Sequence, residues 1–334
     1  MIDFSSKKEF KIALICISLF FLCYFVLGMF IWKDIIYEEI DGFCEGKRQG
    51  LLKEPMNALS NFAYIFVGLY ILYIFDDFPI KGKNPMVTKN IAPVLYAYGS
   101  IYIGLGSFAM HGSNTALGGI LDWSGMLFFI SFPVFYNLSR SYNWFEKRLL
   151  ILFSSIFVFT AFFDAIGSLT DLVLISDYSG TDSLIGKKNL KLKHISRDYL
   201  WALYIGSWII LEAKNISKNN LIIMTSLPLI ALFTLTVDPP HMLLLILTIL
   251  FIVIAYVLYR NPGNEIIRTP SPYLWSGILT YILGNIVWRI DKTVEYCNPD
   301  SLLQYHALWH ILTAQSVYFF YKYFSTEINN PESE

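Results

Sequence analysis

The sequence predicts an all-α fold, a polytopic bundle of about ten transmembrane helices, and two observations carry this prediction. Of the 334 residues, 55% are hydrophobic and only 15% are charged, with a mean hydropathy of +0.50. A soluble domain of this length needs a more polar surface. In addition, long apolar runs recur along the chain, as membrane-crossing helices of about 20 residues require. Backbone groups in lipid have to bond within their own segment, so such runs are helices rather than strands.

The apolar runs divide the chain in order. Seven stretches are strong, at residues 12–32, 57–75, 91–110, 115–138, 241–259, 271–288 and 301–321. Three are shorter, at residues 149–163, 199–211 and 221–237. The first stretch follows lysines, as a signal peptide does, but no small-residue cleavage site closes it, so we interpret it as a retained helix. Residues 164–198 are too polar to cross and are expected to form an inserted loop. We treat residues 1–334 as a single membrane domain.

Charge limits the partners and orients the chain. The net charge is −1, and the sequence contains neither a glycine-rich phosphate loop nor a basic-aromatic track, so we exclude a nucleic-acid partner. With ten crossings both termini lie on one side, where Lys and Arg are slightly in excess. The positive-inside rule therefore predicts a multi-pass membrane protein with cytoplasmic termini.

Three of the five histidines stand at the ends of apolar stretches. His111 closes the third strong stretch, and His306 and His310 begin the last one. A spacing of four places His306 and His310 on one face of a helix, as two ligands of one metal require. Ser107 has the same spacing from His111, so its hydroxyl is expected one turn away on the same face.

The number of crossings predicts that these residues share one side of the membrane. Six crossings separate the end of the third stretch from the start of the last, and an even number returns the chain to the same face. We expect this face to be the extracytoplasmic one. Asp122 lies in an otherwise uncharged stretch, where a carboxylate costs roughly 2.5–3.5 kcal/mol at a helix centre, so we expect it to have a partner. Gly118 and Gly119 indicate a turn that would place Asp122 in the first helical turn.

Three histidines with an open position form the catalytic arrangement typical of zinc, which lowers the pKa of bound water and polarises a carbonyl group. In this hypothesis Asp122 takes the proton of the water and passes it to the leaving nitrogen. Ser107 stabilises the oxyanion or holds the water. The arrangement therefore predicts a metal-dependent hydrolase.

Other interpretations stay open. A single histidine at a helix end is more often an interfacial or capping residue, and we assign that role to His194 and His241. One alternative function is a receptor-like or structural membrane protein, in which zinc clamps helices and a fourth protein ligand closes the site. Another is a proton-coupled transporter that uses Asp122 and Asp291, although the inverted repeats typical of that class are not found.

Five ordered motifs resemble those of the alkaline ceramidase family, over a region that spans residues 43–324. They are Glu54-Pro-Met-Asn-Ala-Leu-Ser-Asn61, Gly104-Leu-Gly-Ser-Phe-Ala-Met-His111, Asp122, Trp288-Arg-Ile-Asp291 and His306-Ala-Leu-Trp-His310-Ile-Leu-Thr. The family consists of seven-helix membrane hydrolases, in a superfamily that includes adiponectin-receptor-like proteins. The first helix and an inserted pair between residues 138 and 271 would be additions to that core.

The resemblance implies hydrolysis of the N-acyl amide bond of a ceramide-like lipid, which enters from the bilayer and yields a fatty acid and a sphingoid-type amine. It implies that His111, His306 and His310 bind Zn²⁺, with Asp122 acting on the water and Ser107 supporting the oxyanion. The lipid's identity and the oligomeric state are not defined by these motifs.

The resemblance also concerns calcium and two cysteines. Eukaryotic members bind Ca²⁺ through an Asp-Trp-Cys-Glu type segment, of which residues 42–45 keep part. Glu45 and Glu54, joined by Asp41, are therefore the candidate Ca²⁺ ligands. Cys44 and Cys297 correspond to family cysteines that pair, and a disulfide between them would require an oxidising, extracytoplasmic face. The alternative is two free thiols in a reducing compartment.

Overall fold

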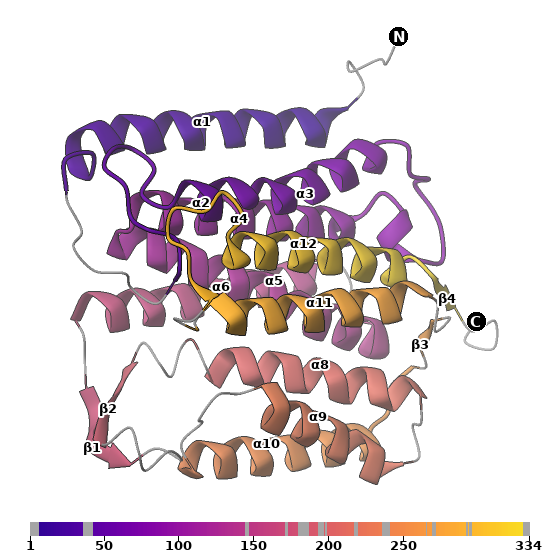
Figure 1. Cartoon of the computed structure of the whole chain (residues 1–334). Helices are drawn as coiled ribbons and strands as arrows, with labels where there is room; N and C mark the ends of the chain where they lie inside the picture. The colour runs from indigo at the N-terminus through magenta and orange to yellow at the C-terminus, as the bar shows by residue number, and fades with distance from the viewer. Residues whose placement is uncertain are drawn as a thin grey trace. The chain divides into compact units, whose positions relative to one another are not determined.

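The computed structural model describes residues 7–35, 43–143, 147–170, 173–179, 187–192, 197, 199–216, 220–235, 241–264, 266–268, 272–291, 293 and 296–329. These residues are predominantly helical (Figure 1), which confirms the all-α class. Each apolar stretch of the sequence overlaps one helix, except for residues 57–75, which cover two consecutive helices. Four of these helices are long and apolar enough to cross a membrane: Lys8–Ile31, Pro55–Phe75, Ile91–Ser113 and Ala116–Tyr142. The structure thus confirms the helical class and shows several segments of membrane length, whereas the seven-helix core stays a prediction.

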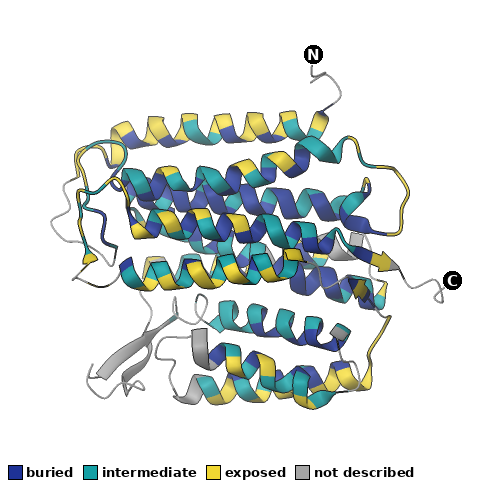
Figure 2. Cartoon of the chain, turned by 45° about the vertical axis from the view of Figure 1, so that its right-hand side comes forward, coloured by how far each residue is buried: buried dark blue, intermediate teal, exposed yellow. Residues whose placement is uncertain are grey.

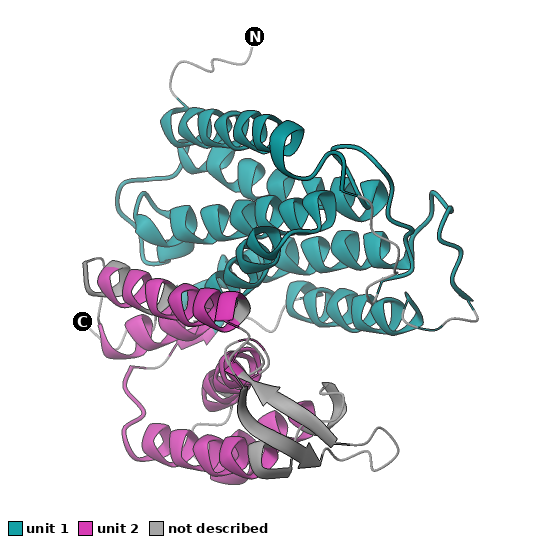
Figure 3. Ribbon diagram, turned by 90° about the vertical axis from the view of Figure 1, so that its left-hand side faces the viewer, with its two compact units in different colours: residues 1–129, 268–328 teal, residues 130–267, 329–334 magenta. Residues whose placement is uncertain are grey.

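The chain divides into two compact units (Figure 3), and unit 1 comprises Met1–Phe129 and Arg268–Ile328. Its helices are α1 (Lys8–Ile31), α2 (Pro55–Ser60), α3 (Phe62–Phe75), α4 (Ile91–Ser113), the first half of α5 (Ala116–Tyr142), α11 (Pro272–Asp291) and α12 (Tyr305–Phe324). A short 3-10 helix, η2 (Pro85–Val87), precedes α4. At the end of α12, Arg268 of β3 (Ile266–Arg268) forms a buried ion pair with Glu327 of β4 (Glu327–Asn329).

Unit 2 comprises Ile130–Ile267 and Asn329–Glu334. It contains the second half of α5, then α6 (Lys147–Thr170), α8 (Leu200–Ile216), α9 (Leu221–Leu235) and α10 (His241–Arg260). Between α6 and α8, β1 (Val173–Ser179) and β2 (Lys187–Lys191) pair antiparallel, with Val173 opposite Lys191 and Ser179 opposite Lys187. Among its described residues, the polar segment 164–198 therefore contains the end of α6 and these two paired strands. Residues 180–186 and His194 lie outside the described residues.

The helices of unit 1 differ in how deeply they are buried (Figure 2). In an 18-residue apolar stretch of α4, 72% is buried, whereas in the corresponding stretch of α1 the buried share is 17%. The α4 helix is therefore the central element of this unit, and α1 presents most of its surface outward. Side chains such as Phe30, which is 83% exposed, have the apolar character that lipid contact demands.

Glycines allow α4 to approach its neighbours closely. A side chain at Gly104 would meet the carbonyl oxygen of Asn61 at 2.8 Å, and one at Gly118 would meet the Ala109 carbonyl oxygen at 2.7 Å. Small residues at such contacts are typical of helix packing in membranes.

The expected turn at Gly118 and Gly119 is wrong, because both glycines lie inside α5. The chain turns instead at Asn114, which takes the left-handed conformation with φ of 50°. Asp122 consequently lies in the second turn of α5 rather than the first. Gly118 serves helix packing, a use that cannot be distinguished from a turn by residue type alone.

Candidate metal centre

Three buried histidines converge within unit 1. His111 lies in the last turn of α4, and His306 and His310 lie in the first two turns of α12. Their potential ligand atoms all lie within 4.8 Å of one another, and their exposed fractions are 3–4%. The Nε2 atoms of His111 and His306 are 3.1 Å apart. The structure therefore brings together the three histidines that the spacing indicated, in a cluster that can bind a metal ion.

The orientation of His111 is set by Glu54. The Nδ1 atom of His111 lies 2.6 Å from Oε2 of Glu54, and both side chains are buried. Backbone pairing holds the two residues in register, since the Glu54 amide donates to the His111 carbonyl at 3.1 Å. When Nδ1 donates its proton to the carboxylate, Nε2 carries the lone pair that a metal requires.

The orientation of His310 is set by Ser60. Its Nδ1 lies 2.8 Å from the Ser60 hydroxyl, which itself donates to the Asn57 carbonyl at 2.8 Å. Because the single hydroxyl proton serves Asn57, Ser60 accepts from Nδ1–H of His310. This leaves the Nε2 atom of His310 as the ligand atom, and the Ser107 hydroxyl lies 3.4 Å from it.

Asp291 fixes the backbone at His306. Its Oδ1 accepts the His306 amide and its Oδ2 accepts the Cys44 amide, each at 3.2 Å. The N-cap residue of α12, Gln304, makes no side-chain capping bond. A carboxylate from α11 therefore supplies the acceptor that the first turn of α12 needs.

Glu45 plays a similar part at α2. Its two carboxylate oxygens accept the amides of Met56 and Asn57, at 2.8 and 2.7 Å. Burial raises the pKa of Glu45, while these two backbone donors act in the opposite direction. The carboxylate thus satisfies the open amides at the start of the helix that leads to Ser60.

Calcium binding by Glu45 and Glu54 stays a prediction. Among the residues that the structure describes, the histidine cluster is the one place where three or more potential ligand side chains come together. Neither glutamate belongs to it. Both carboxylates have the protein partners given above, and Asp41 lies outside the described residues.

A disulfide joins Cys44 to Cys297, with 5.3 Å between their Cα atoms. It ties the segment before α2 to the connection between α11 and α12. The neighbouring residue, Phe43, lies against two of the histidines, with ring centroids 4.2 Å from His306 and 5.0 Å from His111. The disulfide thus holds an aromatic side chain over the cluster.

Asp122 lies beside the cluster rather than in it. It is buried, with an exposed fraction of 6%, and its backbone packs on Gly106, the residue before Ser107. The Asp122 carboxylate is close enough to the side chains of His111, Tyr64 and Tyr102 for its charge to act on them. The predicted acid is therefore near the predicted ligands, on the helix that follows His111.

Sequence reasoning missed three supporting roles: Glu54 as the partner of His111, Ser60 as the partner of His310, and Asp291 as the cap beneath His306. Each acts across a large sequence separation, from 15 residues for Asp291 and His306 to 250 for Ser60 and His310. All three residues stand in the motifs quoted above, which mark the residues but do not reveal their partners.

The fold and the cluster together define a helical protein with membrane-length segments and a buried three-histidine site suited to a transition metal. Comparison with known proteins adds no family, because no family model matches the sequence and no curated protein matches it.

Proposed function

We propose that the protein is an integral membrane, zinc-dependent hydrolase of the alkaline ceramidase type. It cleaves the N-acyl amide bond of a ceramide-like lipid and releases a fatty acid and a sphingoid-type amine. The observation that carries this proposal is the set of three buried imidazoles whose potential ligand atoms lie within 4.8 Å of one another, with Nδ1 of His111 on Glu54 and Nδ1 of His310 on Ser60. Zinc bound there supplies an activated water and polarises the amide carbonyl.

The surrounding side chains have the chemistry that amide hydrolysis needs. The Asp122 carboxylate accepts the proton of the attacking water and returns it to the nitrogen that leaves. The Ser107 hydroxyl, close to His310, donates to the oxygen on which negative charge develops. The Phe43 ring, against His306 and His111, excludes bulk water on one side of the cluster.

A lipid substrate fits the position of the cluster. His111 lies near the end of α4, one of the four helices of membrane length, and with α4 across the bilayer the site would lie at the depth of a membrane boundary. An amide with two hydrocarbon tails reaches this depth directly from the bilayer. The Cys44–Cys297 disulfide favours an oxidising compartment and hence an extracytoplasmic site, with cytoplasmic termini.

The number of ligands favours an enzyme over a zinc clamp. A structural zinc site is closed by four protein ligands, whereas the cluster formed by the described residues has three. A transporter that uses Asp291 is disfavoured because both of its oxygens accept backbone amides that hold helix ends.

The test combines metal analysis with a lipid assay on purified protein. We expect about one zinc per chain and release of fatty acid from a ceramide. His111→Ala, His306→Ala and His310→Ala are expected to lose both metal and activity, whereas Asp122→Asn is expected to keep the metal and lose turnover. His241→Ala, on α10 of unit 2, is the matched control and is expected to retain both. A zinc-free protein with full activity would end the proposal.

A further inference from the structure

The end of α1 is bonded to the segment that precedes Glu54. The Tyr24 hydroxyl and the Trp32 indole nitrogen both donate to the carbonyl oxygen of Leu51, at 2.8 and 3.2 Å. Both aromatic side chains are buried, each with an exposed fraction of 5%, although α1 is mostly exposed. Two donors thus converge on one acceptor in a connecting segment.

Lys53 forms a second link between the same elements. Its side chain is fully buried, and its Nζ donates to the carbonyl of Ile35 at 2.7 Å and to that of Lys33 at 3.5 Å. The Gly50 amide also donates to the Lys33 carbonyl, at 3.3 Å. The chain just after α1 is therefore joined to residues 50–53 through both side chains and backbone.

Residues 51–54 lead directly to the histidine cluster. The amide of Lys53 donates to the Gly112 carbonyl at 2.8 Å, and the amide of Glu54 donates to the His111 carbonyl at 3.1 Å. This pairing aligns Glu54 with the end of α4, where its carboxylate reaches Nδ1 of His111. A displacement of Leu51 would accordingly displace the carboxylate.

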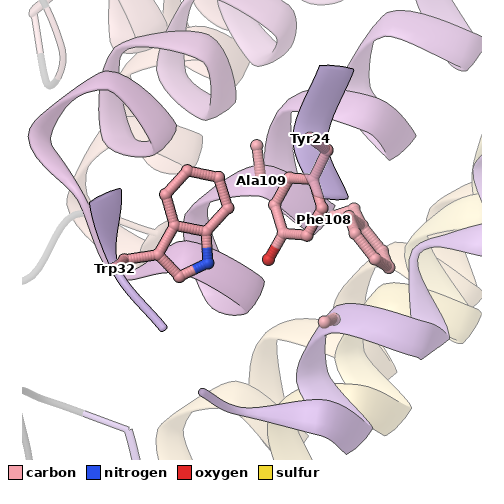
Figure 4. Packing of buried hydrophobic residues seen from close by; sticks show 5 residues of the cluster. Tyr24, Trp32, Phe108 and Ala109 are labelled. Atoms are coloured by element: carbon pink, nitrogen blue, oxygen red, sulfur yellow. The ribbon is translucent and has the colours of Figure 1, made fainter. Parts of the chain in front are cut away.

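Aromatic packing supports the same contact (Figure 4). The Tyr24 ring lies 4.9 Å from that of Trp32 and 5.1 Å from that of Phe108, measured between centroids. Phe108 follows Ser107 on α4, so α1 packs directly behind the turn of α4 that faces the cluster. Gly112 leaves room for the Tyr24 hydroxyl, because a side chain at this position would collide with it.

We propose that α1 is a working part of the metal centre, in which Tyr24 and Trp32 are positioning residues that hold residues 51–54 and thereby keep Glu54 on His111. A hydrophobic anchor would need only apolar contacts with lipid, whereas these buried donors converge on the carbonyl of Leu51, three residues before the partner of His111. The inference rests on metal binding by the cluster and not on the reaction that the cluster carries out.

The test uses the full chain in detergent, loaded with Co²⁺, whose visible absorption reports the geometry of its ligands. Metal release to a chelator is timed for the wild type, Tyr24→Phe, Trp32→Phe and the double variant. Each single change removes a donor and keeps an aromatic ring, so each should release metal about fivefold faster. The double variant should release it more than tenfold faster, with a changed cobalt spectrum.

Two controls separate positioning from general stability. Lys7→Gln breaks the contact of Lys7 with Asp77, which joins the opposite end of α1 to the chain after α3 at 2.5 Å. Tyr259→Phe removes a hydroxyl from α10 in unit 2. Both should leave the release rate unchanged, even where the thermal midpoint falls.

Equal release rates for the double variant and the wild type, at a temperature where circular dichroism shows both folded, would overturn the proposal. So would a wild-type chain that binds no metal. Faster release in the variants of a protein that hydrolyses no lipid amide would support the positioning role while ending the proposed hydrolase function.

Discussion

Replacing Glu54 by glutamine probes the contact that orients His111 in the proposed zinc site. The change preserves the size of the side chain but removes the charge that accepts the Nδ1 proton of His111 at 2.6 Å. Hydrogen bonds to charged groups are worth about 1.5–3 kcal/mol, compared with about 1 kcal/mol between neutral groups. The difference of about 0.5–2 kcal/mol corresponds to a loss of about 2- to 30-fold in metal affinity. Mutations of such partners typically cost about 10- to 100-fold.

The assay is competition for zinc between the purified protein and a chelator of known affinity. We expect Glu54→Gln to bind about tenfold more weakly than the wild type, with unchanged helix content. Glu212→Gln, on α8 of unit 2, is the matched control, because it makes the same change at a glutamate that accepts from Asn137 and Trp208. Wild-type affinity in a folded Glu54→Gln protein would refute the assignment of Glu54 as the partner that activates His111.

Three further predictions concern the supports of the cluster. Ser60→Ala should weaken zinc binding about fivefold in the same competition assay, and Ser60→Thr should restore it, because His310 regains its hydroxyl acceptor. Burial raises the pKa of the Glu45 carboxyl above its ordinary value of 4.5. The stability contributed by the protonated carboxyl is therefore complete below that pH and is lost as the pH rises through the raised pKa. The thermal midpoint should fall over this pH range in the wild type, and Glu45→Gln should remove this dependence. Cys44→Ser with Cys297→Ser should lower the free energy of unfolding by about 2–5 kcal/mol, and a midpoint equal to that of the wild type would contradict this expectation.

The helical class was predictable because lipid leaves a chain few choices. Runs of apolar residues that cannot expose backbone groups have to form helices, and the apolar stretches of the sequence all coincide with helices. The ends of the helices were harder to predict from the sequence. The stretch 57–75 is divided into α2 and α3 at Asn61, which hydropathy does not register. The last helix, α12, begins at Tyr305, whereas the apolar stretch begins at residue 301.

The histidine cluster was predictable for a related reason. The spacing of His306 and His310 is a property of any helix, and an even number of crossings returns the chain to one face whatever the packing. These two arguments needed no contacts. The position of Asp122 relied instead on the interpretation of two glycines as a turn, and that local detail was wrong.

By itself, then, the sequence determined that the chain is helical, that it suits a membrane and that three histidines can meet. Only the tertiary structure decided which side chains hold them: Glu54 on His111, Ser60 on His310, and Asp291 beneath His306. The physical reason is that helix formation and spacing depend on neighbouring residues, whereas a hydrogen bond between residues as distant as Ser60 and His310 depends on how whole helices pack.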